Sequence, residues 1–339
     1  MDCIKGKHVL VIGGTGTVGS ALVKRLLHMD PAVIRVFSRD EHKQYVMQSR
    51  LSMGVGGFPS YSMGKVRFLL GDVRDKERLK RAMEDIDVVF HLAALKHVPA
   101  CEYNPFEAVK TNSIGTQNVI ECAIEGGVSK VIYASSDKAA GPTNTMGATK
   151  LLAERLISAA DLHKGPRDTQ FFSVRFGNVL NSRGSVVPLF KQQIKAGGPV
   201  TVTHPEMTRF FMSVERAVDL ILDSMLLARG GETFVFKMPV MRIGDLARAM
   251  VIASGTGAEI TNIGLRPGEK MFEELMTEEE SCRAMETEDL YIILPFHLDL
   301  DQVKNLYGGR RVARGGMYIS SQEQPLAVEQ IVDMLKKIG

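Results

Sequence analysis

The chain has 339 residues, of which 45% are hydrophobic and 24% charged, and its net charge of +3 is too small to indicate a nucleic-acid-binding protein. No apolar run approaches the roughly 18 residues that span a bilayer, and the first residues lack the apolar core of a signal peptide, so we expect no membrane insertion. The four cysteines have neither metal-ligand spacing nor a paired framework, which predicts no metal site and a reduced, cytoplasmic location.

Short apolar runs alternate with amphipathic segments of helix length through the first half of the chain. Near-continuous apolar strands separated by helices are typical of a parallel sheet that is covered on both faces. Right-handed crossovers then predict an α/β fold with a doubly wound parallel sheet. Strands are expected at residues 8–13, 33–38, 66–70, 87–92, 130–134 and 171–176, helices at 18–28, 78–84, 108–125 and 150–160, and a loop that lengthens one crossover at 51–65.

The alternation loosens after Gly177. Five prolines between residues 188 and 267 divide the chain into short helices and strands, and a charged helical tail follows. We expect residues 1–177 to form a nucleotide-binding Rossmann domain. Residues 178–339 are expected to form mainly a smaller substrate-binding lobe, with part of this chain returning to the main sheet.

A glycine-rich turn, Gly-Gly-Thr-Gly-Thr-Val-Gly at residues 13–19, follows the first predicted strand and opens a helix. Glycines permit a tight turn and close approach of the backbone, and the helix N-terminus presents free N–H groups to a pyrophosphate. A glycine-rich helix start without a ligand is the alternative, but the position after the first strand favours a dinucleotide site. The contacts are expected from Gly13, Gly16, Thr17, Val18 and Gly19.

The end of the second predicted strand bears on the choice of cofactor. An Arg at this position accommodates the 2′-phosphate of NADP, whereas a carboxylate binds the ribose hydroxyls of NAD. Arg39 therefore favours NADP, and Asp40 keeps NAD possible; a solvated helix start with an acidic cap is the alternative. The cofactor residues expected here are Ser38, Arg39 and Lys43. Asp72 and Val73, after the third strand, are expected to contact the edge of the adenine; a surface turn is the alternative for Asp72.

Ser136, Asp137 and Lys138 directly follow the fifth predicted strand, with Met146 eight residues beyond Lys138 and Lys150 four residues further. This spacing is similar to the active site of short-chain dehydrogenases/reductases, in which a Ser or Thr precedes a Tyr-x-x-x-Lys pair. The tyrosine position is Met146, and a thioether can neither take nor give a proton. Taken one at a time, the Ser-Asp pair at 136–137 could be a helix cap, Met146 a residue of the apolar core and Lys150 a solvated side chain. Their joint spacing favours a catalytic interpretation.

The chain resembles the extended short-chain dehydrogenases/reductases. It resembles more closely the nucleotide-sugar 4,6-dehydratases that act on UDP-N-acetylglucosamine in capsule, flagellin-glycan and sialic-acid-like sugar pathways. A known branch of that family carries Met-x-x-x-Lys, so the methionine does not indicate an inactive enzyme. The resemblance covers about residues 8 to 275, and its matching segments are 91–99, 102–105, 135–140, 175–179, 182–188, 207–210 and 266–270.

The resemblance implies a reaction that oxidises carbon 4 of the hexosamine, eliminates water across carbons 5 and 6, and returns the hydride to carbon 6. Lys138 is the expected base at carbon 5. Like charge from the cofactor, Lys150 and Lys96 is expected to lower the pKa of its amine and free a neutral form.

The other catalytic roles follow from the same resemblance. Asp137 is the expected acid for the departing carbon-6 hydroxyl. The base at carbon 4 is either Asp137 or a water beside Met146 that relays to Asp137 or Lys150. Ser136 is expected to hold the carbon-4 oxygen, and Lys150 is expected to bind the nicotinamide ribose.

A UDP-sugar brings two phosphates, which guanidinium groups match in bidentate geometry. Arg183, Arg209 and Arg266 are therefore the expected phosphate ligands, and Glu269 the expected acceptor from the ribose. His97 could equally be a structural histidine. The resemblance assigns Ala93, Ala94, Lys96, Asn112 and Lys150 to the cofactor, and Lys96, His97, Asn178, Val179, Arg183, Gly184, Ser185, Val186, Val187, Arg209, Arg266 and Glu269 to the substrate.

Two other functions are open. A nucleotide-sugar epimerase on the same scaffold would also reuse its cofactor, but it would not need a base at carbon 5. A non-catalytic NADP-binding sensor would explain the missing tyrosine, but not the retained Lys138 and Lys150. The nucleotide, the sugar epimer and the configuration at carbon 5 are left open. A homo-oligomer, a dimer or larger, is the default that the resemblance implies.

Overall fold

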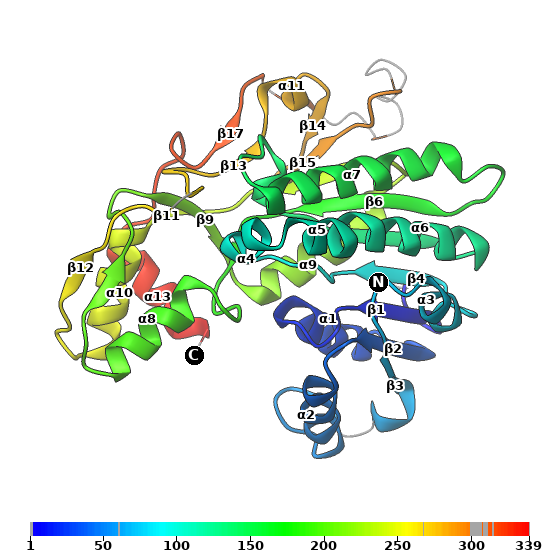
Figure 1. Cartoon of the computed structure of the whole chain (residues 1–339), viewed down its shortest axis with the longest axis horizontal. Helices are drawn as coiled ribbons and strands as arrows, with labels where there is room; N and C mark the ends of the chain where they lie inside the picture. Colours follow the sequence, from blue (N-terminus) through cyan, green and yellow to red (C-terminus); the bar gives the residue numbers. More distant parts are fainter. Residues whose placement is uncertain are drawn as a thin grey trace.

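The computed structural model describes residues 3–59, 62–266, 268–298, 307, 311–313 and 315–338. Among these residues, ten strands form one sheet in the order β16-β14-β15-β10-β6-β5-β4-β1-β2-β3 (Figure 1). From β3 to β10 the neighbouring strands pair in parallel. These strands are β1 (His8–Ile12), β2 (Val33–Ser38), β3 (Val66–Leu70), β4 (Val88–His91), β5 (Lys130–Ala134), β6 (Gln170–Arg175) and β10 (Thr233–Phe236).

The predicted doubly wound parallel sheet is confirmed. β2, β3 and β5 begin and end at the predicted residues, β1 differs by one residue at its end, and β4 and β6 differ by one residue at each end. The agreement follows from burial, because a strand that is covered on both faces must be apolar along its whole length. The predicted loop is shorter than expected, since α2 (Glu41–Ser52) continues into it, and residues 60 and 61 lie outside the described part of the chain.

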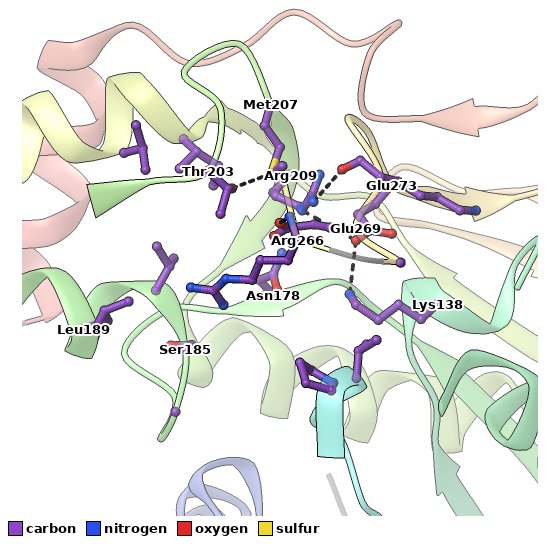
Figure 2. Close-up of a pocket in the computed structure, with 18 of the residues that line it drawn as sticks. Lys138, Asn178, Ser185, Leu189, Thr203, Met207, Arg209, Arg266, Glu269 and Glu273 are labelled. Atoms are coloured by element: carbon purple, nitrogen blue, oxygen red, sulfur yellow. Dashed lines mark hydrogen bonds and ion pairs between the residues drawn. The ribbon is translucent and has the colours of Figure 1, made fainter. Parts of the chain in front are cut away.

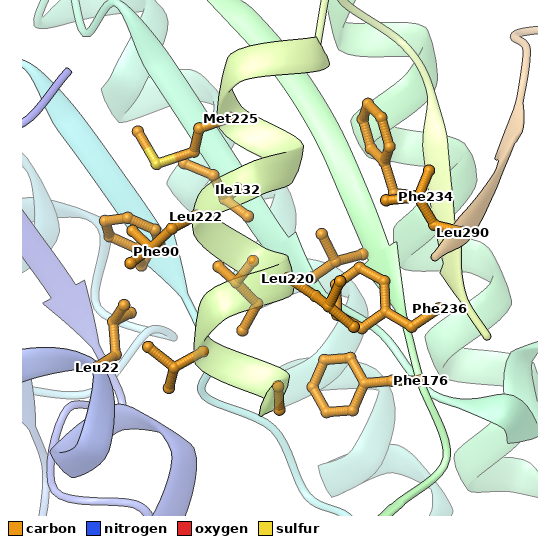
Figure 3. Close-up of a cluster of buried hydrophobic side chains, with 14 of the residues drawn as sticks. Leu22, Phe90, Ile132, Phe176, Leu220, Leu222, Met225, Phe234, Phe236 and Leu290 are labelled. Atoms are coloured by element: carbon orange, nitrogen blue, oxygen red, sulfur yellow. The ribbon is translucent and has the colours of Figure 1, made fainter. Parts of the chain in front are cut away.

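Two layers of helices cover the sheet (Figure 1). The helices α3 (Lys76–Ala82), α6 (Gly115–Glu125) and α7 (Thr145–His163) share one apolar cluster with one face of the strands. The helices α1 (Thr17–Leu27) and α9 (Val214–Leu227) share another cluster with the opposite face. Figure 3 shows the α9 side of that core, where Leu220, Leu222 and Met225 lie among Phe90, Ile132, Phe176, Phe234 and Phe236.

One predicted helix, residues 108–125, is interrupted. The chain forms α5 (Pro105–Ala108), a π-helical turn η2 (Val109–Ile114) and then α6. The side chain of Asn112, inside the π turn, accepts from the backbone N–H of Leu95 at 2.8 Å and donates to the carbonyl of Leu95 at 3.0 Å. The wider π turn places this amide against the segment that follows β4, a common use of π-bulges near functional sites.

Residues after 177 contribute both to the main sheet and to a separate cluster. The strands β10, β15 (Leu290–Ile293), β14 (Ala284–Glu286) and β16 (Arg311–Val312) extend the sheet. A smaller lobe packs α8 (Val186–Lys195), α10 (Ile243–Ser254) and α13 (Val328–Ile338) into one apolar cluster, on the left in Figure 1. The division at residue 177 stays a prediction. No helix within the described ranges is both long and apolar enough to cross a membrane.

Candidate active site

A cavity of about 540 Å³ is lined by the connection after β5 and by the smaller lobe (Figure 2). Lys138 enters it from the short helix η3 (Asp137–Ala139), and Asn178 from the strand β7 (Asn178–Val179). Arg209 of β9 (Thr208–Met212) lines it from the other side of the chain's fold, together with Arg266, residues 268–270 and Glu273. The cavity has the size and the mixture of apolar and charged walls that small-molecule sites have.

Ser136, Asp137 and Lys138 form one hydrogen-bonded unit at the end of β5. Oδ1 of Asp137 accepts from Ser136 Oγ at 2.6 Å, from the Lys138 backbone N–H at 2.9 Å and from Lys138 Nζ at 3.0 Å. Ser136 Oγ also accepts from the Lys138 N–H at 3.3 Å, so Ser136 caps η3. Asp137 is only 2% exposed, and its Oδ2 has no hydrogen-bond partner within the described part of the chain. A buried oxygen of this kind is expected to have a partner in the working protein.

The predicted lowering of the Lys138 pKa is wrong. Its Nζ lies 3.0 Å from Asp137 Oδ1 and 3.2 Å from Oε1 of Glu273. Burial and Arg209 disfavour the ammonium form, but these two carboxylates outweigh them and raise the pKa of Lys138 well above its ordinary value. The sequence prediction considered the neighbouring amines and missed the second carboxylate. Lys138 is therefore charged at neutral pH in the structure.

Glu273 is a residue that the sequence analysis missed. It is 6% exposed, lines the cavity, and its Oε1 also lies 3.5 Å from Nε of Arg209 (Figure 2). Arg209 in turn donates to the carbonyl oxygens of Thr208 at 2.8 Å and Lys270 at 2.7 Å. Glu273 stands three residues after the matching segment 266–270 and belongs to no motif, so only the folded structure identifies it.

Lys150 is buried in α7 and does not line the cavity. Its Nζ donates to the carbonyl oxygen of Ala134 at 2.6 Å and lies 4.3 Å from the centre of the Tyr133 ring. Burial lowers the pKa of Lys150 to about 7 despite the opposing field of Glu154. The expected positive field from this lysine is therefore only partly present at neutral pH.

Met146 belongs to the core. Its side chain is 3% exposed and packs with Cys101 and Ala108 in a small apolar cluster. Water is retained in buried sites that offer it polar partners, and this cluster is apolar. The structure therefore does not support Met146 as a catalytic residue, nor a relay water held against it.

The glycine-rich turn fits a dinucleotide. Gly13 has φ +82°, and a Cβ built there would lie 2.8 Å from the backbone nitrogen of Ala93. A Cβ on Gly19 would lie 2.4 Å from the carbonyl oxygen of Gly13, and Gly16 is the N-cap of α1. Only glycine permits this approach between the turn, the helix start and the segment after β4. The cradle leaves the N-terminus of α1 open to a phosphate.

The residues expected at the cofactor ribose lie together at the end of β2. Asp40 caps α2 by accepting from the Lys43 N–H at 2.9 Å, and it also pairs with Lys43 Nζ. Arg39 is mostly exposed, and its NH1 lies 3.8 Å from the carboxylate of Asp72. Ser38 Oγ lies 2.9 Å from Oγ1 of Thr15, another residue that the sequence analysis did not assign.

Arg183 lies at the glycine-rich turn and does not line the substrate cavity. Its guanidinium donates to the carbonyl oxygen of Thr15, and its backbone N–H donates to Oγ1 of Thr17 at 3.2 Å. Lys96 Nζ donates to the carbonyl oxygen of Arg183 at 2.7 Å. These contacts join the smaller lobe to the glycine-rich turn, so Arg183 lies at the expected cofactor site and not in the cavity with the other predicted substrate residues.

Several other residues that were expected to bind cofactor or substrate contact other parts of the protein instead. The amide of Asn112 holds the backbone of Leu95, and it thereby positions the segment that contains Ala93 and Ala94. His97 is exposed and outside the cavity lining, and a Cβ on Gly184 would lie 2.7 Å from its ring. Buried apolar packing accounts for the side chains of Val73, Val179 and Val187.

The remaining substrate residues line one cavity. Arg266 extends into it, and the backbone N–H of Arg266 donates to Oε2 of Glu269 at 3.2 Å (Figure 2). Asn178 donates to the carbonyl oxygen of Phe210 at 3.2 Å. Pro267, within the same matching segment, lies outside the described residues. The predicted substrate residues that the structure brings together here are Asn178, Gly184, Ser185, Val186, Arg209, Arg266 and Glu269.

The whole chain is similar to known proteins. A family model described as polysaccharide biosynthesis protein matches residues 9–295. The inverting UDP-N-acetylglucosamine 4,6-dehydratase of Campylobacter jejuni (strain 81-176) is 41% identical over 339 residues, with 97% of each chain covered. The UDP-glucose 4-epimerase of Rickettsia conorii is 40% identical over 334 residues, covering 97% of this chain and 95% of that one. The crystal structure of Pen from Bacillus thuringiensis has 45% identity and a TM-score of 0.89, covering 99% of this chain and 100% of that one.

Proposed function

The chain belongs to the polysaccharide biosynthesis protein family, within the extended short-chain dehydrogenases/reductases, and on this basis we propose that it is a UDP-N-acetylglucosamine 4,6-dehydratase. It is an enzyme of nucleotide-sugar metabolism that uses a nicotinamide cofactor; the exact reaction and the choice of NADP are our proposals. The observation that carries the reaction is Lys138, which lines the cavity together with Glu273 and pairs with both Glu273 and the buried Asp137.

The proposed reaction converts the substrate to a UDP-4-keto-6-deoxy-N-acetylhexosamine. The nicotinamide cofactor, when bound, supplies reversible hydride chemistry, so that carbon 4 is oxidised and carbon 6 is later reduced without net consumption. A ketone at carbon 4 acidifies the proton on carbon 5, and water is then lost across carbons 5 and 6. The enzyme must supply a base for carbon 5 and an acid for the departing hydroxyl.

We assign the base at carbon 5 to Lys138 and the acid to Asp137. Lys138 lines the cavity, and the buried Asp137 behind it accepts from Lys138 Nζ through Oδ1, while its Oδ2 has no partner among the described residues. Ser136 is placed to hold the carbon-4 oxygen once it exchanges its bond to Asp137 for one to the sugar. With Met146 in the core, Asp137 is our choice for the base at carbon 4, with Lys150 a hydrogen-bond donor near the nicotinamide ribose.

The substrate pyrophosphate is assigned to Arg266, with Arg209 beside it. Arg209 uses three of its donors on Glu273 and two backbone carbonyls, which fixes its orientation and leaves two donors for a ligand. NADP is favoured over NAD because Asp40 is engaged as a helix cap while Arg39 is largely exposed beside it.

Epimerisation at carbon 4 is the second candidate, because the Rickettsia relative carries that name at 40% identity. Such a reaction leaves carbon 5 untouched, and it gives no role to an amine held between two carboxylates. Incubation of the protein with UDP-N-acetylglucosamine and catalytic NADP separates the two by mass spectrometry. A product lighter by one water supports the dehydratase, whereas a product of unchanged mass overturns it.

A further inference from the structure

Glu273 is a buried carboxylate on the cavity wall whose backbone is held by a second buried residue. It directly precedes β13 (Glu274–Met276), and its N–H donates to Oγ of Ser320 at 2.9 Å. The N–H of Ser320 donates back to the carbonyl oxygen of Glu273 at 2.9 Å. Ser320 is fully buried and is itself bonded to Thr208. The backbone that carries the carboxylate is therefore held by groups that lie outside the cavity lining.

Three charged groups face the Lys138 amine. Asp137 Oδ1 and Glu273 Oε1 lie 3.0 and 3.2 Å from Nζ, and the Arg209 guanidinium approaches the same Glu273 oxygen from the other side at 3.5 Å. Two carboxylates against one guanidinium favour the ammonium form of Lys138. An ammonium group has no lone pair, so it cannot act as a base until it has lost one proton to a nearby acceptor.

We propose that Glu273 is a positioning residue that takes the extra proton of Lys138 and so frees the amine to act as the base at carbon 5. The inference rests on the function proposed above. In this step one N–H bond of Lys138 breaks and one O–H bond of Glu273 forms, and no other reactant is needed. The amine takes the proton of carbon 5 and returns a proton to that carbon at the end of the cycle. The proton on Glu273 then moves back to Lys138.

Glu273 suits this step better than Asp137 does. Oδ1 of Asp137 is already engaged by three hydrogen bonds, from Ser136 Oγ and from both nitrogens of Lys138. Within the described ranges, Glu273 Oε1 contacts Lys138 at 3.2 Å and Arg209 at the longer distance of 3.5 Å. Asp137 also has a separate task at the carbon-6 hydroxyl in the proposed reaction.

The test compares Glu273→Gln, which keeps the shape but cannot take a proton, with Glu274→Gln as a matched control. Glu274 is the next residue on the same segment and does not line the cavity. Between about pH 7 and pH 9, we expect kcat of the wild type and of Glu274→Gln to be nearly constant. In Glu273→Gln, we expect kcat at about pH 7 to fall at least 100-fold, with KM changed less than about threefold. Above that pH, kcat of this variant should rise about tenfold per pH unit, because solvent must now remove the proton from Lys138.

Two results would overturn the inference by kinetics. One is a loss of kcat in Glu273→Gln without the new dependence on pH, which is what a purely structural role predicts. The other is a kcat that stays within about threefold of the wild type, since an acid–base partner contributes more than that. Glu273→Asp keeps a carboxylate. We expect its kcat to be higher than that of Glu273→Gln and not to rise with pH.

A second measurement does not depend on turnover. Labelling of Lys138 by acetic anhydride, followed by mass spectrometry of its peptide, reports the fraction of neutral amine at each pH. We expect labelling in Glu273→Gln to begin at least about one pH unit lower than in the wild type, because the resting ammonium loses one of its two carboxylates, and Glu274→Gln to be unchanged. The labelling tests the ion pair in the resting protein, whereas the kinetics test the proton transfer during turnover. Unchanged labelling in Glu273→Gln overturns the inference. If labelling shifts in Glu273→Gln but the wild type forms no 4-keto product, the proposed function and the carbon-5 step are overturned. The link between the two side chains then still stands.

Discussion

The side-chain nitrogen of Lys150 donates a 2.6 Å hydrogen bond to the carbonyl oxygen of Ala134, at the end of the strand that leads to Ser136. The lysine of the Met-x-x-x-Lys pair is thus anchored to the backbone beside the catalytic unit. It is buried, and burial lowers its pKa to about 7. Protonation of Lys150 is therefore less favourable in free energy in the folded protein than in the unfolded chain.

The first prediction is a dependence of stability on pH. Above the unfolded pKa of about 10.5, Lys150 is neutral in both states, and below about 7 it is charged in both. Between these values the unfolded chain binds more protons, so the contribution of Lys150 to stability rises with pH. Lys150→Met should raise the melting temperature of the cofactor-free protein most at about pH 6, and less as pH approaches 10. Thermal unfolding at several pH values measures this, and a gain that grows with pH contradicts it.

The second prediction concerns Lys138. Because its nitrogen faces the cavity between two carboxylates, Lys138→Ala should lower kcat by about 100- to 10,000-fold. Cofactor affinity should change little, since the expected dinucleotide cradle is formed by Gly13–Gly19 and Ala93. Product formation and fluorescence titration with NADPH check the two parts. Equal losses of turnover and cofactor affinity would assign Lys138 to the cofactor instead.

The third prediction separates the arginines. Arg183→Ala should weaken cofactor binding, because the side chain donates to the carbonyl of Thr15 in the glycine-rich turn. Arg266→Ala should instead weaken UDP binding, because that side chain extends into the cavity. Each change should cost about 1.5–3 kcal/mol, the range of a hydrogen bond to a charged group. Calorimetric titration of both variants with NADP and with UDP tests this, and a reversed pattern contradicts the assignment.

The fourth prediction concerns Met146. Met146→Leu keeps an apolar side chain of similar size and should cost less than about 1.5 kcal/mol of stability, with kcat within a few-fold of the wild type. Met146→Ala should cost about 2–5 kcal/mol by leaving a cavity beside Cys101 and Ala108. Chemical denaturation and steady-state rates measure both. A large loss of kcat in the leucine variant would return Met146 to the catalytic mechanism.

The fifth prediction tests the cofactor cradle. Gly19→Ala places a Cβ about where the carbonyl of Gly13 lies, at 2.4 Å, so the turn and the helix must move apart. Binding of NADP should be lost or weakened by at least tenfold. Gly64→Ala is the control, because a Cβ there meets no atom within 4 Å. Retention of full cofactor affinity in Gly19→Ala would contradict the proposed position of the pyrophosphate.

The strands and most helices of the first half of the chain could be predicted from the sequence, because local apolar periodicity indicates them, whereas the order of the strands in the sheet comes from the structure. The site was only partly predictable. Lys138 and Asp137 were found because they are neighbours in a motif, but Glu273 approaches from a segment more than a hundred residues away. No local pattern encodes that contact, so the direction of the Lys138 pKa shift was predicted wrongly.

Arg183 illustrates a second limit. Its residue type and its motif indicate a phosphate ligand, but the sequence does not say which phosphate. Only the fold places the loop 182–185 against the glycine-rich turn, through the contacts to Thr15 and Thr17. The predicted homo-oligomer also stays a prediction, since it depends on surfaces between chains.

The account depends most on proton removal at carbon 5 of the sugar, and turnover in deuterated water measures that step directly. Purified protein is incubated with UDP-N-acetylglucosamine and NADP in deuterium oxide, and the product is analysed by proton NMR. We predict a 4-keto-6-deoxy sugar that carries deuterium at carbon 5, with a signal pattern that also reports the configuration there. A carbon-4 epimer that retains its 6-hydroxyl and its carbon-5 proton would contradict the account.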